Sequence, residues 1–207
     1  LSTVAGCAYN TSVKKMKALK TVTIYAQKRG YLLHDPFLNH RFHLEPVNRG
    51  FLTDEEIMKI ANKDFGIQRL ELVRDVFIFS CFTGLAITDM EHLTFGHIKS
   101  AADGQMYIRK ERQKTKVEFI VPLHPIAKTI IEQQRQLKAV KEEGNNTDMD
   151  NRLIFQPCCS RSVLAAKLSI VGKACGIKQR LSYHMGRHTF GTMCLSAGIP
   201  IESIAKM

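Results

Sequence analysis

Apolar residues recur every three or four positions through much of this chain, a spacing typical of amphipathic helices. The segment 10–29 has this spacing, and Gly30 follows it directly as a helix stop. Its apolar positions are Val13, Met16, Leu19, Val22, Tyr25 and Ala26. The pattern predicts one helix with lysines on its outer face. Residues 30–50 then contain two prolines, scattered histidines and no periodicity, so we expect a linker there.

Two capping-box patterns come next, TDEE at 53–56 and TDME at 88–91. In a capping box, a threonine and a glutamate three residues later bind each other's backbone N–H groups at the start of a helix. We therefore expect a helix to begin at each. Between them, LELVRDVFIFSCF is almost wholly apolar and predicts a central core helix from about Gln68 to Gly84.

After the second capping box, the helical spacing of apolar residues is replaced by an alternation of apolar and polar residues. The segments QMYIRK and KVEFIVPL flank a short basic turn, and Val117, Phe119 and Val121 alternate with Lys116 and Glu118. This pattern is typical of an antiparallel hairpin.

Further helices follow the hairpin, together with one short apolar run. RLIF at 152–155 is expected to be a short strand, and GNNTD at 144–148 a loop. The helices are expected to begin near Pro125, Ser160, Ser182 and Pro200, and Gly176 and Gly198 should end the second and third. The predicted fold class is mainly α with a small antiparallel β sheet (α+β), and the sequence has no internal repeat.

Composition limits the class of protein. The chain has 207 residues, of which 44% are apolar, enough for a packed core. No apolar run approaches the ~18 residues of a membrane span, and no secretory signal pattern is present, so we expect a soluble cytoplasmic protein. The six cysteines lack metal-site spacing, and buried free thiols are the expected state.

Charge indicates the kind of partner. Lysine and arginine outnumber aspartate and glutamate by 30 to 19, which gives a net charge of +11. Residues 1–50 hold eight of these basic residues against two acids, and RKERQKTK at 109–116 forms a second basic cluster. Two separated patches favour an extended polyanion such as duplex DNA. Ordinary solvated faces are the alternative.

The segment LSYHMGRHTFGTMCLSAGIPIESIAKM at 181–207 carries the candidate chemistry. His184 and His188 have the i, i+4 spacing of a zinc helix, but Arg187 between them would oppose a metal ion. We therefore expect no metal at this position. His184 and Arg187 lie on one helix face and together present donors suited to a phosphate. HRFH at 40–43 lacks partner ligands and is interpreted as surface histidine.

Three segments in order resemble one family: FSCFTGLAITDMEHLT, RQKTKVEFIVPL, and HMGRHTFGTMCLSAGIPIESIAKM. They are similar to the catalytic domain of the tyrosine recombinases, the phage integrase family, in the variant found in integrases of conjugative transposons and related mobile elements. The resemblance implies a catalytic domain over 47–207. It also implies that residues 1–46 are the end of a helical, SAM-like core-binding domain plus linker, a domain that began before residue 1.

The resemblance assigns roles residue by residue. Lys114 matches the lysine that protonates the departing 5′ oxygen, and His184 matches the histidine that exchanges a proton with the nucleophile. Arg187 matches the second catalytic arginine, which holds the scissile phosphate. The expected DNA contacts are Lys14, Lys17, Arg109, Arg112, Lys116 and His188, the last also as packing support for the His184–Arg187 pair. No cofactor is implied.

The sequence departs from the family at two places. Ala86 stands where the family's first catalytic arginine is expected, and a methyl group cannot contact phosphate. Arg74, one helix earlier, is our candidate for the substitute cation, with an exposed structural arginine as the alternative. In addition, no tyrosine occupies the place of the family's nucleophile, and Tyr183 is expected to pack or to contact DNA. The chain is therefore expected to end before the nucleophile.

These expectations define the function. We expect part of a site-specific DNA recombinase that, when intact, cleaves and rejoins duplex DNA through a 3′-phosphotyrosyl intermediate. The partners are recombination sites and further copies of the chain, as a tetramer on DNA. The 207 residues alone are expected to bind DNA without cleaving it. A DNA-binding regulator with the same fold is the alternative, and a metal-dependent nuclease is disfavoured because no carboxylate cluster is found.

Overall fold

The computed structural model describes residues 6–47, 50–141, 149–156 and 160–207. The chain divides into two compact units, residues 1–48 and 49–207. No helix of the described residues is long and apolar enough to cross a membrane.

The first unit is built on one helix, α1 (Tyr9–Lys28), as the apolar spacing predicted. It ends where Gly30 adopts a left-handed conformation with φ 77°. The segment after it returns alongside, because the Asn10 side chain both donates to the Glu45 carbonyl and accepts from the Glu45 N–H, each at 2.9 Å. Of the helix, only Val13 is buried, so this unit has little core of its own.

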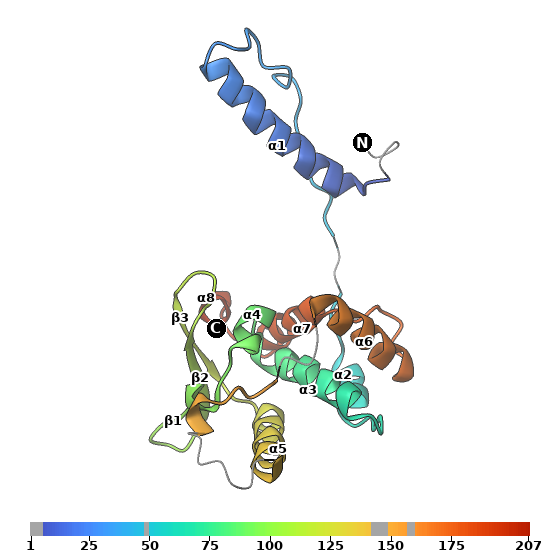
Figure 1. The fold of residues 1–207 in the computed structure, drawn as a ribbon, viewed down its shortest axis with the longest axis vertical. Helices are drawn as coiled ribbons and strands as arrows, with labels where there is room; N and C mark the ends of the chain where they lie inside the picture. Colours follow the sequence, from blue (N-terminus) through green and yellow to red (C-terminus); the bar gives the residue numbers. More distant parts are fainter. Residues whose placement is uncertain (1–5, 48–49, 142–148, 157–159) are drawn as a thin grey trace. The chain divides into compact units, whose positions relative to one another are not determined.

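The second unit is built around α3 (Gln68–Thr83), which packs against four other helices (Figure 1). These are α2 (Asp54–Ala61), α5 (Pro125–Lys141), α6 (Arg161–Ala174) and α7 (Tyr183–Ser196). The shorter helices are α4 (Ile87–Glu91), η1 (Phe95–His97), η2 (Met149–Asn151) and α8 (Ile201–Lys206). Every residue of α3 from Asp75 to Thr83 is buried, which confirms the predicted central core helix.

A three-stranded antiparallel sheet lies beside these helices, in the order β1 (Ile98–Ser100), β2 (Met106–Glu111) and β3 (Glu118–Pro122). Ile108 in the middle strand pairs with Val121 of β3, and both are fully buried. Phe119 also points inward, whereas Val117 is 59% exposed because it lies in the turn before β3 begins. The hairpin and the fold class are confirmed, and β1 is a strand that the sequence pattern did not reveal.

The TDEE prediction is confirmed and the TDME prediction is wrong. Thr53 and Glu56 exchange both capping hydrogen bonds at the start of α2. Near TDME, however, the N-cap of α4 is Ala86, two residues before Thr88, because the Ala86 carbonyl already accepts the N–H groups three and four residues on. Thr88 therefore lies inside the helix. The next capping box is formed by Thr94 and His97 at η1.

Two further predictions need correction. Instead of a strand, RLIF contributes a single bridge between Leu153 and Thr94, because the chain turns into η1 directly after Thr94. The helix expected at Ser160 does begin there as α6, but the Ser160 hydroxyl bonds to Ser162 instead of capping the backbone. The GNNTD loop, Cys158 and Cys159 lie outside the described residues. The other four cysteines are free thiols, and two of them, Cys81 and Cys194, are buried.

Candidate functional site

The start of α7 carries the H-x-x-R pair. The Ser182 side chain accepts the Met185 N–H at 3.3 Å and caps the helix. Gly186 allows α7 to lie directly on α3, since a Cβ at this position would stand 2.2 Å from the hydroxyl oxygen of Ser80. Because the two helices approach so closely at Gly186, the backbone of the next residue, Arg187, is held in a fixed position.

Two side chains of α7 bind the corner between α3 and α4. An Arg187 Nη1 donates to the Gly84 carbonyl at 2.8 Å, and the Tyr183 hydroxyl donates to the Leu85 carbonyl at 3.1 Å. Gly84 is left-handed with φ 65° and packs under the Phe190 ring. This corner is the TGLA segment of the sequence, so the structure joins the third and the first of the three family-like motifs at one point in space.

Burial decides the protonation of Tyr183. Removal from water raises the pKa of its phenol, because the charged phenolate is disfavoured there. Tyr183 therefore stays neutral and holds the corner, which agrees with the packing role considered from the sequence.

Arg187 lies in a positive environment. Burial lowers the pKa of its guanidinium, and the charge of Arg112 lowers it further, while Asp89 acts in the opposite direction. An arginine pKa starts so high that the group stays charged near neutral pH. A half-buried cation with a second cation beside it favours binding of an anion.

The two histidines of this helix lie next to Arg187. The rings of His184 and His188 meet edge to face, with 4.6 Å between their centroids. Both side chains are exposed, so His184 is accessible to a large ligand. Within the described residues, no group of three or more histidine, cysteine or acidic side chains is placed to hold a metal ion.

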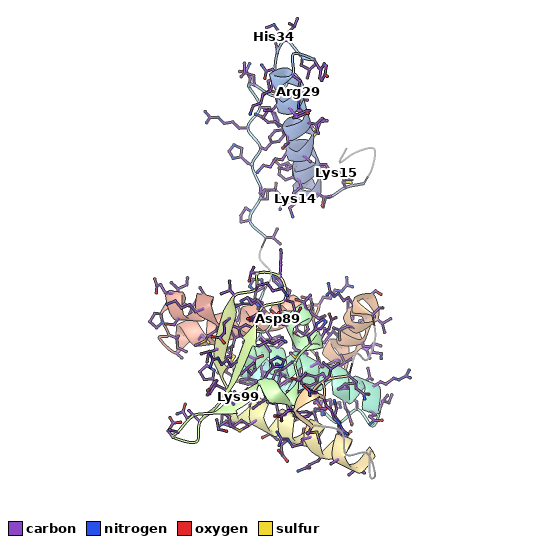
Figure 2. The ribbon with its side chains drawn as sticks, turned by 60° about the vertical axis from the view of Figure 1, so that its left-hand side comes forward. Lys14, Lys15, Arg29, His34, Asp89 and Lys99 are labelled. Carbon is purple, nitrogen blue, oxygen red and sulfur yellow. The ribbon has the colours of Figure 1, made fainter. Side chains whose placement is uncertain are left out.

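Lys114 lies in the turn between β2 and β3, with its side chain exposed. One buried carboxylate ties this turn to α4, because Oδ1 of Asp89 accepts the Gln113 N–H at 2.8 Å. Asp89 is only 3% exposed and comes three residues after Ala86. Gln113 is thus fixed to α4, the helix that follows the 84–86 corner, and its neighbours in the chain are Arg112 and Lys114. Figure 2 labels Asp89 beside the strands of the hairpin.

The remaining predicted basic residues are spread more widely. Arg109 pairs with Glu118 across the hairpin at 2.7 Å, and Lys116 adopts a left-handed conformation in the turn with φ 56°. Lys14 and Lys17 belong to α1 in the other unit. Figure 2 shows Lys14 and Arg29 along this helix.

Arg74 is not brought to this group. Its guanidinium donates to the Asp75 carboxylate at 2.9 Å and to the Lys63 carbonyl at 2.7 Å. Gly84 follows it by ten residues along α3, which corresponds to about 15 Å along the helix axis. These contacts favour the alternative that Arg74 has a structural role. It joins α3 to the segment that follows α2.

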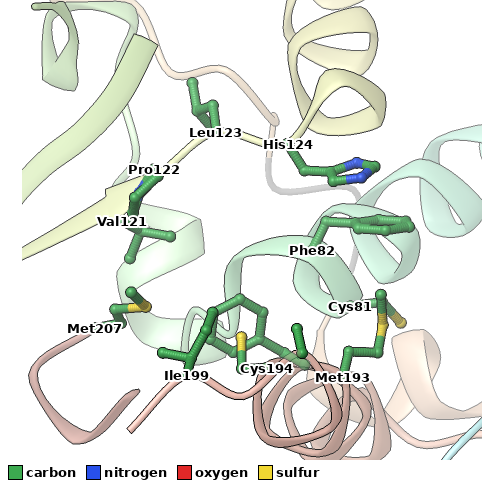
Figure 3. A pocket seen from close by; sticks show the side chains of 12 residues that line it. Cys81, Phe82, Val121, Pro122, Leu123, His124, Met193, Cys194, Ile199 and Met207 are labelled. Atoms are coloured by element: carbon green, nitrogen blue, oxygen red, sulfur yellow. The ribbon is translucent and has the colours of Figure 1, made fainter. Parts of the chain in front are cut away.

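The apolar pocket of this unit is a separate feature (Figure 3). It has a volume of about 310 Å³ and is lined mainly by apolar side chains of α3, β3 and α7. The His124 ring stacks on Phe82 at its edge, with centroids 4.5 Å apart. A cavity of this lining does not suit a phosphate.

Comparison with known proteins decides the family. The model of the Phage integrase family matches residues 52–207. The chain belongs to the phage integrase family. Among curated protein sequences, no match to the chain is found.

Solved structures of integrases and recombinases share the fold. A Tn1549 transposon integrase in complex with circular intermediate DNA is 15% identical, with a TM-score of 0.66, over 99% of this chain and 72% of that one. The XerH recombinase bound to its difH substrate is 16% identical, with a TM-score of 0.59, over 82% of this chain and 51% of that one. A lambda integrase dimer bound to a core site is 18% identical, with a TM-score of 0.62, over 87% of this chain and 51% of that one. This integrase-family chain thus spans about half the length of the XerH and lambda proteins.

Two buried polar residues of this integrase-family chain were missed from the sequence. Asp89 lies in the motif that was interpreted as a capping box, and no signal in the sequence marked it as buried. Lys110, 7% exposed, donates to the His92 carbonyl at 2.8 Å and lies 3.3 Å from the His97 ring. Burial lowers the pKa of Lys110. Both residues hold the hairpin against the rest of the unit.

Proposed function

We propose that this chain is part of a site-specific DNA recombinase and that Arg187, His184 and Lys114 form its phosphate site. The observation that carries the proposal is the corner at 84–86. Arg187 binds it directly, and Asp89 ties the turn of Lys114 to the helix that follows it. These contacts support the proposal that Lys114, from the hairpin turn, acts at the same phosphate as His184 and Arg187 of α7.

The proposed reaction is phosphoryl transfer. A tyrosine oxygen attacks the phosphorus, a 3′-phosphotyrosyl bond forms, and the bond from phosphorus to the 5′ oxygen breaks. Lys114 gives its proton to the departing 5′ oxygen, and His184 exchanges a proton with the nucleophile. Arg187 stabilises the charge that builds on the non-bridging oxygens, the role that Mg²⁺ has in kinases. Attack by the free 5′ hydroxyl of a second strand reverses the step and rejoins the DNA.

The nucleophile is proposed to lie outside the five tyrosines of this sequence. Tyr183 is partly buried and donates its hydroxyl proton to the Leu85 carbonyl. Tyr9, Tyr25 and Tyr31 belong to the other unit, and Tyr107 lies in the middle strand of the sheet. We therefore propose that the 207 residues bind duplex DNA without cleaving it.

The partners follow from the same reasoning. Relatives of the same fold are bound to DNA recombination sites in their structures, one of them as a dimer. For this chain we propose duplex recombination sites and a tetramer on DNA in the intact protein. We also propose that residues 1–46 are the end of a core-binding domain and that Lys14 and Lys17 contact the DNA backbone from there.

The test uses a duplex selected from a random library by the 207-residue chain. Each phosphate of this duplex is replaced in turn by a neutral methylphosphonate, and binding of the wild type and of Arg187→Ala is measured. One phosphate should lower the affinity of the wild type by about tenfold or more when neutralised, and that of Arg187→Ala far less, since a hydrogen bond to a charged group contributes about 1.5–3 kcal/mol.

Two results would contradict the proposal. If the wild type and Arg187→Ala lose the same affinity at every neutralised phosphate, the proposed phosphate site is wrong. A DNA-binding regulator is then the better function. The alanine at position 86, where the family has its first arginine, is the observation that favours this second candidate. If the 207-residue chain forms a covalent adduct with DNA, the statement about the nucleophile is wrong. Arg69→Ala, an exposed arginine at the start of α3, is the matched control and should retain the wild-type response.

A further inference from the structure

A second pocket of the second unit lies between α2, α3 and α5. It has a volume of about 230 Å³, less than the ~300–1,000 Å³ of sites for drug-sized ligands. Its lining residues are different from those of the proposed phosphate site. Its apolar walls are formed by Met58, Ala61, Ile78, Ile126 and Ile130. The pocket therefore suits a molecule of about one ring.

The charged part of this pocket is the ion pair of Arg74 and Asp75. Asp75 is only 9% exposed. Its Oδ1 accepts a hydrogen bond from Nε of Arg74 at 2.9 Å and lies 2.8 Å from Nη2 of the same residue. In the part of the chain that the structure describes, no hydrogen bond to Oδ2 is found. One oxygen of a buried carboxylate is thus left for a further donor.

This second oxygen is not sealed inside the protein. Among the described residues, the fully enclosed side-chain polar atoms without a partner are the hydroxyls of Ser12 and Ser80, and Oδ2 of Asp75 is not one of them. Burial raises the pKa of Asp75, while the charge of Arg74 and its hydrogen bond act in the opposite direction. A donor that reached Oδ2 through the pocket would therefore stabilise the charged carboxylate.

The remaining polar lining of the pocket is neutral. Asn62 follows α2, Gln133 belongs to α5, and the side-chain amide of each offers both a donor and an acceptor. The charges of Arg74 and Asp75 cancel, so a charged ligand would enter a partly buried site without a counter-ion of its own. The lining thus favours a neutral group that donates to a carboxylate and accepts from an amide N–H.

We propose that this pocket binds a small neutral molecule through a carboxamide group. One N–H of the carboxamide donates to Oδ2 of Asp75, its carbonyl accepts from a side-chain amide of the pocket, and its body packs on the apolar walls. A carboxamide carries a donor and an acceptor on neighbouring atoms, as this lining requires. The inference does not depend on the proposed function, because the two sites have different residues.

Four molecules of similar shape test the chemistry of the pocket. Benzamide carries the carboxamide, acetophenone has a methyl group in place of its N–H₂, protonated benzamidine is a cation and benzoate is an anion. Each is titrated into the ¹⁵N-labelled 207-residue chain, and the Kd is taken from amide chemical shifts of residues 58–62, 74–78 and 126–133. Benzamide should bind most tightly. Acetophenone should bind about tenfold or more weakly, since it cannot donate to the carboxylate. The two charged molecules should also bind more weakly than benzamide.

Asp75→Asn tests the part played by Oδ2. Arg74 should keep the oxygen of the new amide, so an N–H₂ group takes the place of Oδ2 and an acceptor becomes a donor. Benzamide should then bind about tenfold or more weakly than to the wild type. Acetophenone should lose little, because its carbonyl can accept from the new donor. A purely structural effect would weaken both molecules equally.

Thr129→Trp fills the pocket from α5 and leaves the ion pair unchanged. It should abolish the binding of benzamide, and it provides the measurement if circular dichroism shows that Asp75→Asn does not fold. Gln136→Trp is the matched control, because Gln136 is exposed on the same helix and does not line this pocket. It should bind benzamide as the wild type does.

Other results overturn the inference. Equal affinities of the wild type for benzamide and acetophenone would show that no donor is recognised. Tighter binding of benzamidine or benzoate would show that the pocket takes a charged group. Benzamide binding that persists in Thr129→Trp would lie elsewhere on the protein, and the lack of any shift with benzamide at millimolar concentration would mean that the pocket is not a ligand site.

Discussion

The two sides of the proposed phosphate site are held in different ways. The corner at 84–86 is packed, because Gly84 and Gly186 bring α3 and α7 together and two side chains of α7 bind its carbonyls. The hairpin turn that carries Lys114 is exposed and is tied to the rest of the unit by Asp89. A group that stabilises developing charge works best when it is fixed in advance. A proton donor on an exposed turn can instead adjust its position when DNA binds.

Breaking the packed side should give the largest effect. Gly84→Ala places a methyl group 2.3 Å from the Phe190 ring in a left-handed conformation. We expect a loss of about 2–4 kcal/mol in the free energy of unfolding, from backbone strain and overpacking together. Denaturant unfolding followed by circular dichroism measures this loss, since the chain has no tryptophan.

Gly104→Ala is the control for Gly84→Ala. Gly104 is also left-handed, with φ 79°, but nothing lies within 4 Å of its added Cβ. It should lose about 1–2 kcal/mol, from backbone strain alone. Equal losses in the two variants would show that the corner is not tightly packed.

Releasing the exposed side should have a smaller and more local effect. Asp89→Ala removes the acceptor of the Gln113 N–H, and we expect a loss of about 1–3 kcal/mol from a buried hydrogen bond to a charged group. Hydrogen exchange should become faster over residues 112–117, while α7 keeps its protection. Asp103→Ala is the control, because Asp103 accepts a turn N–H in the same way but is exposed. If the 112–117 turn exchanges as slowly as in the wild type, Asp89 does not hold it.

The smallest expected effect is the change of stability with pH that His97 of η1 contributes. Burial and the charge of Lys110 lower the pKa of His97, so the folded protein favours the uncharged ring. The unfolded chain then takes up the proton first as the pH falls through about 6.5, and stability is lost below that pH. One group can contribute no more than about 1.4 kcal/mol per pH unit.

His97→Asn tests this contribution. The variant should lose less stability than the wild type between pH 7 and pH 5.5, measured by denaturant unfolding at each pH. His92→Asn is the control for loss of an imidazole, since that side chain is exposed near the same turn. An unchanged pH dependence in His97→Asn would mean that the folded protein does not lower the pKa of His97.

Local patterns predicted the elements better than their contacts. The limits of α3 and α7 and the capping box at Thr53 could be derived from the sequence, because each depends on residues within one or two helical turns. The TDME motif was misinterpreted for a tertiary reason. The left-handed turn at Gly84 starts α4 early, so that Thr88 lies inside the helix and Asp89 turns inward to the hairpin.

The sequence alone determined the helical class, the basic character and the three motifs that place the chain among the phage integrases, because periodicity, charge and motif order are written along the chain. Only the tertiary structure showed that Arg187 binds the corner before Ala86, that Asp89 ties the hairpin to α4, and that Arg74 is engaged with Asp75. These relations join residues from different elements through hydrogen bonds and buried charge. Such contacts depend on how helices pack around α3, which no local pattern records.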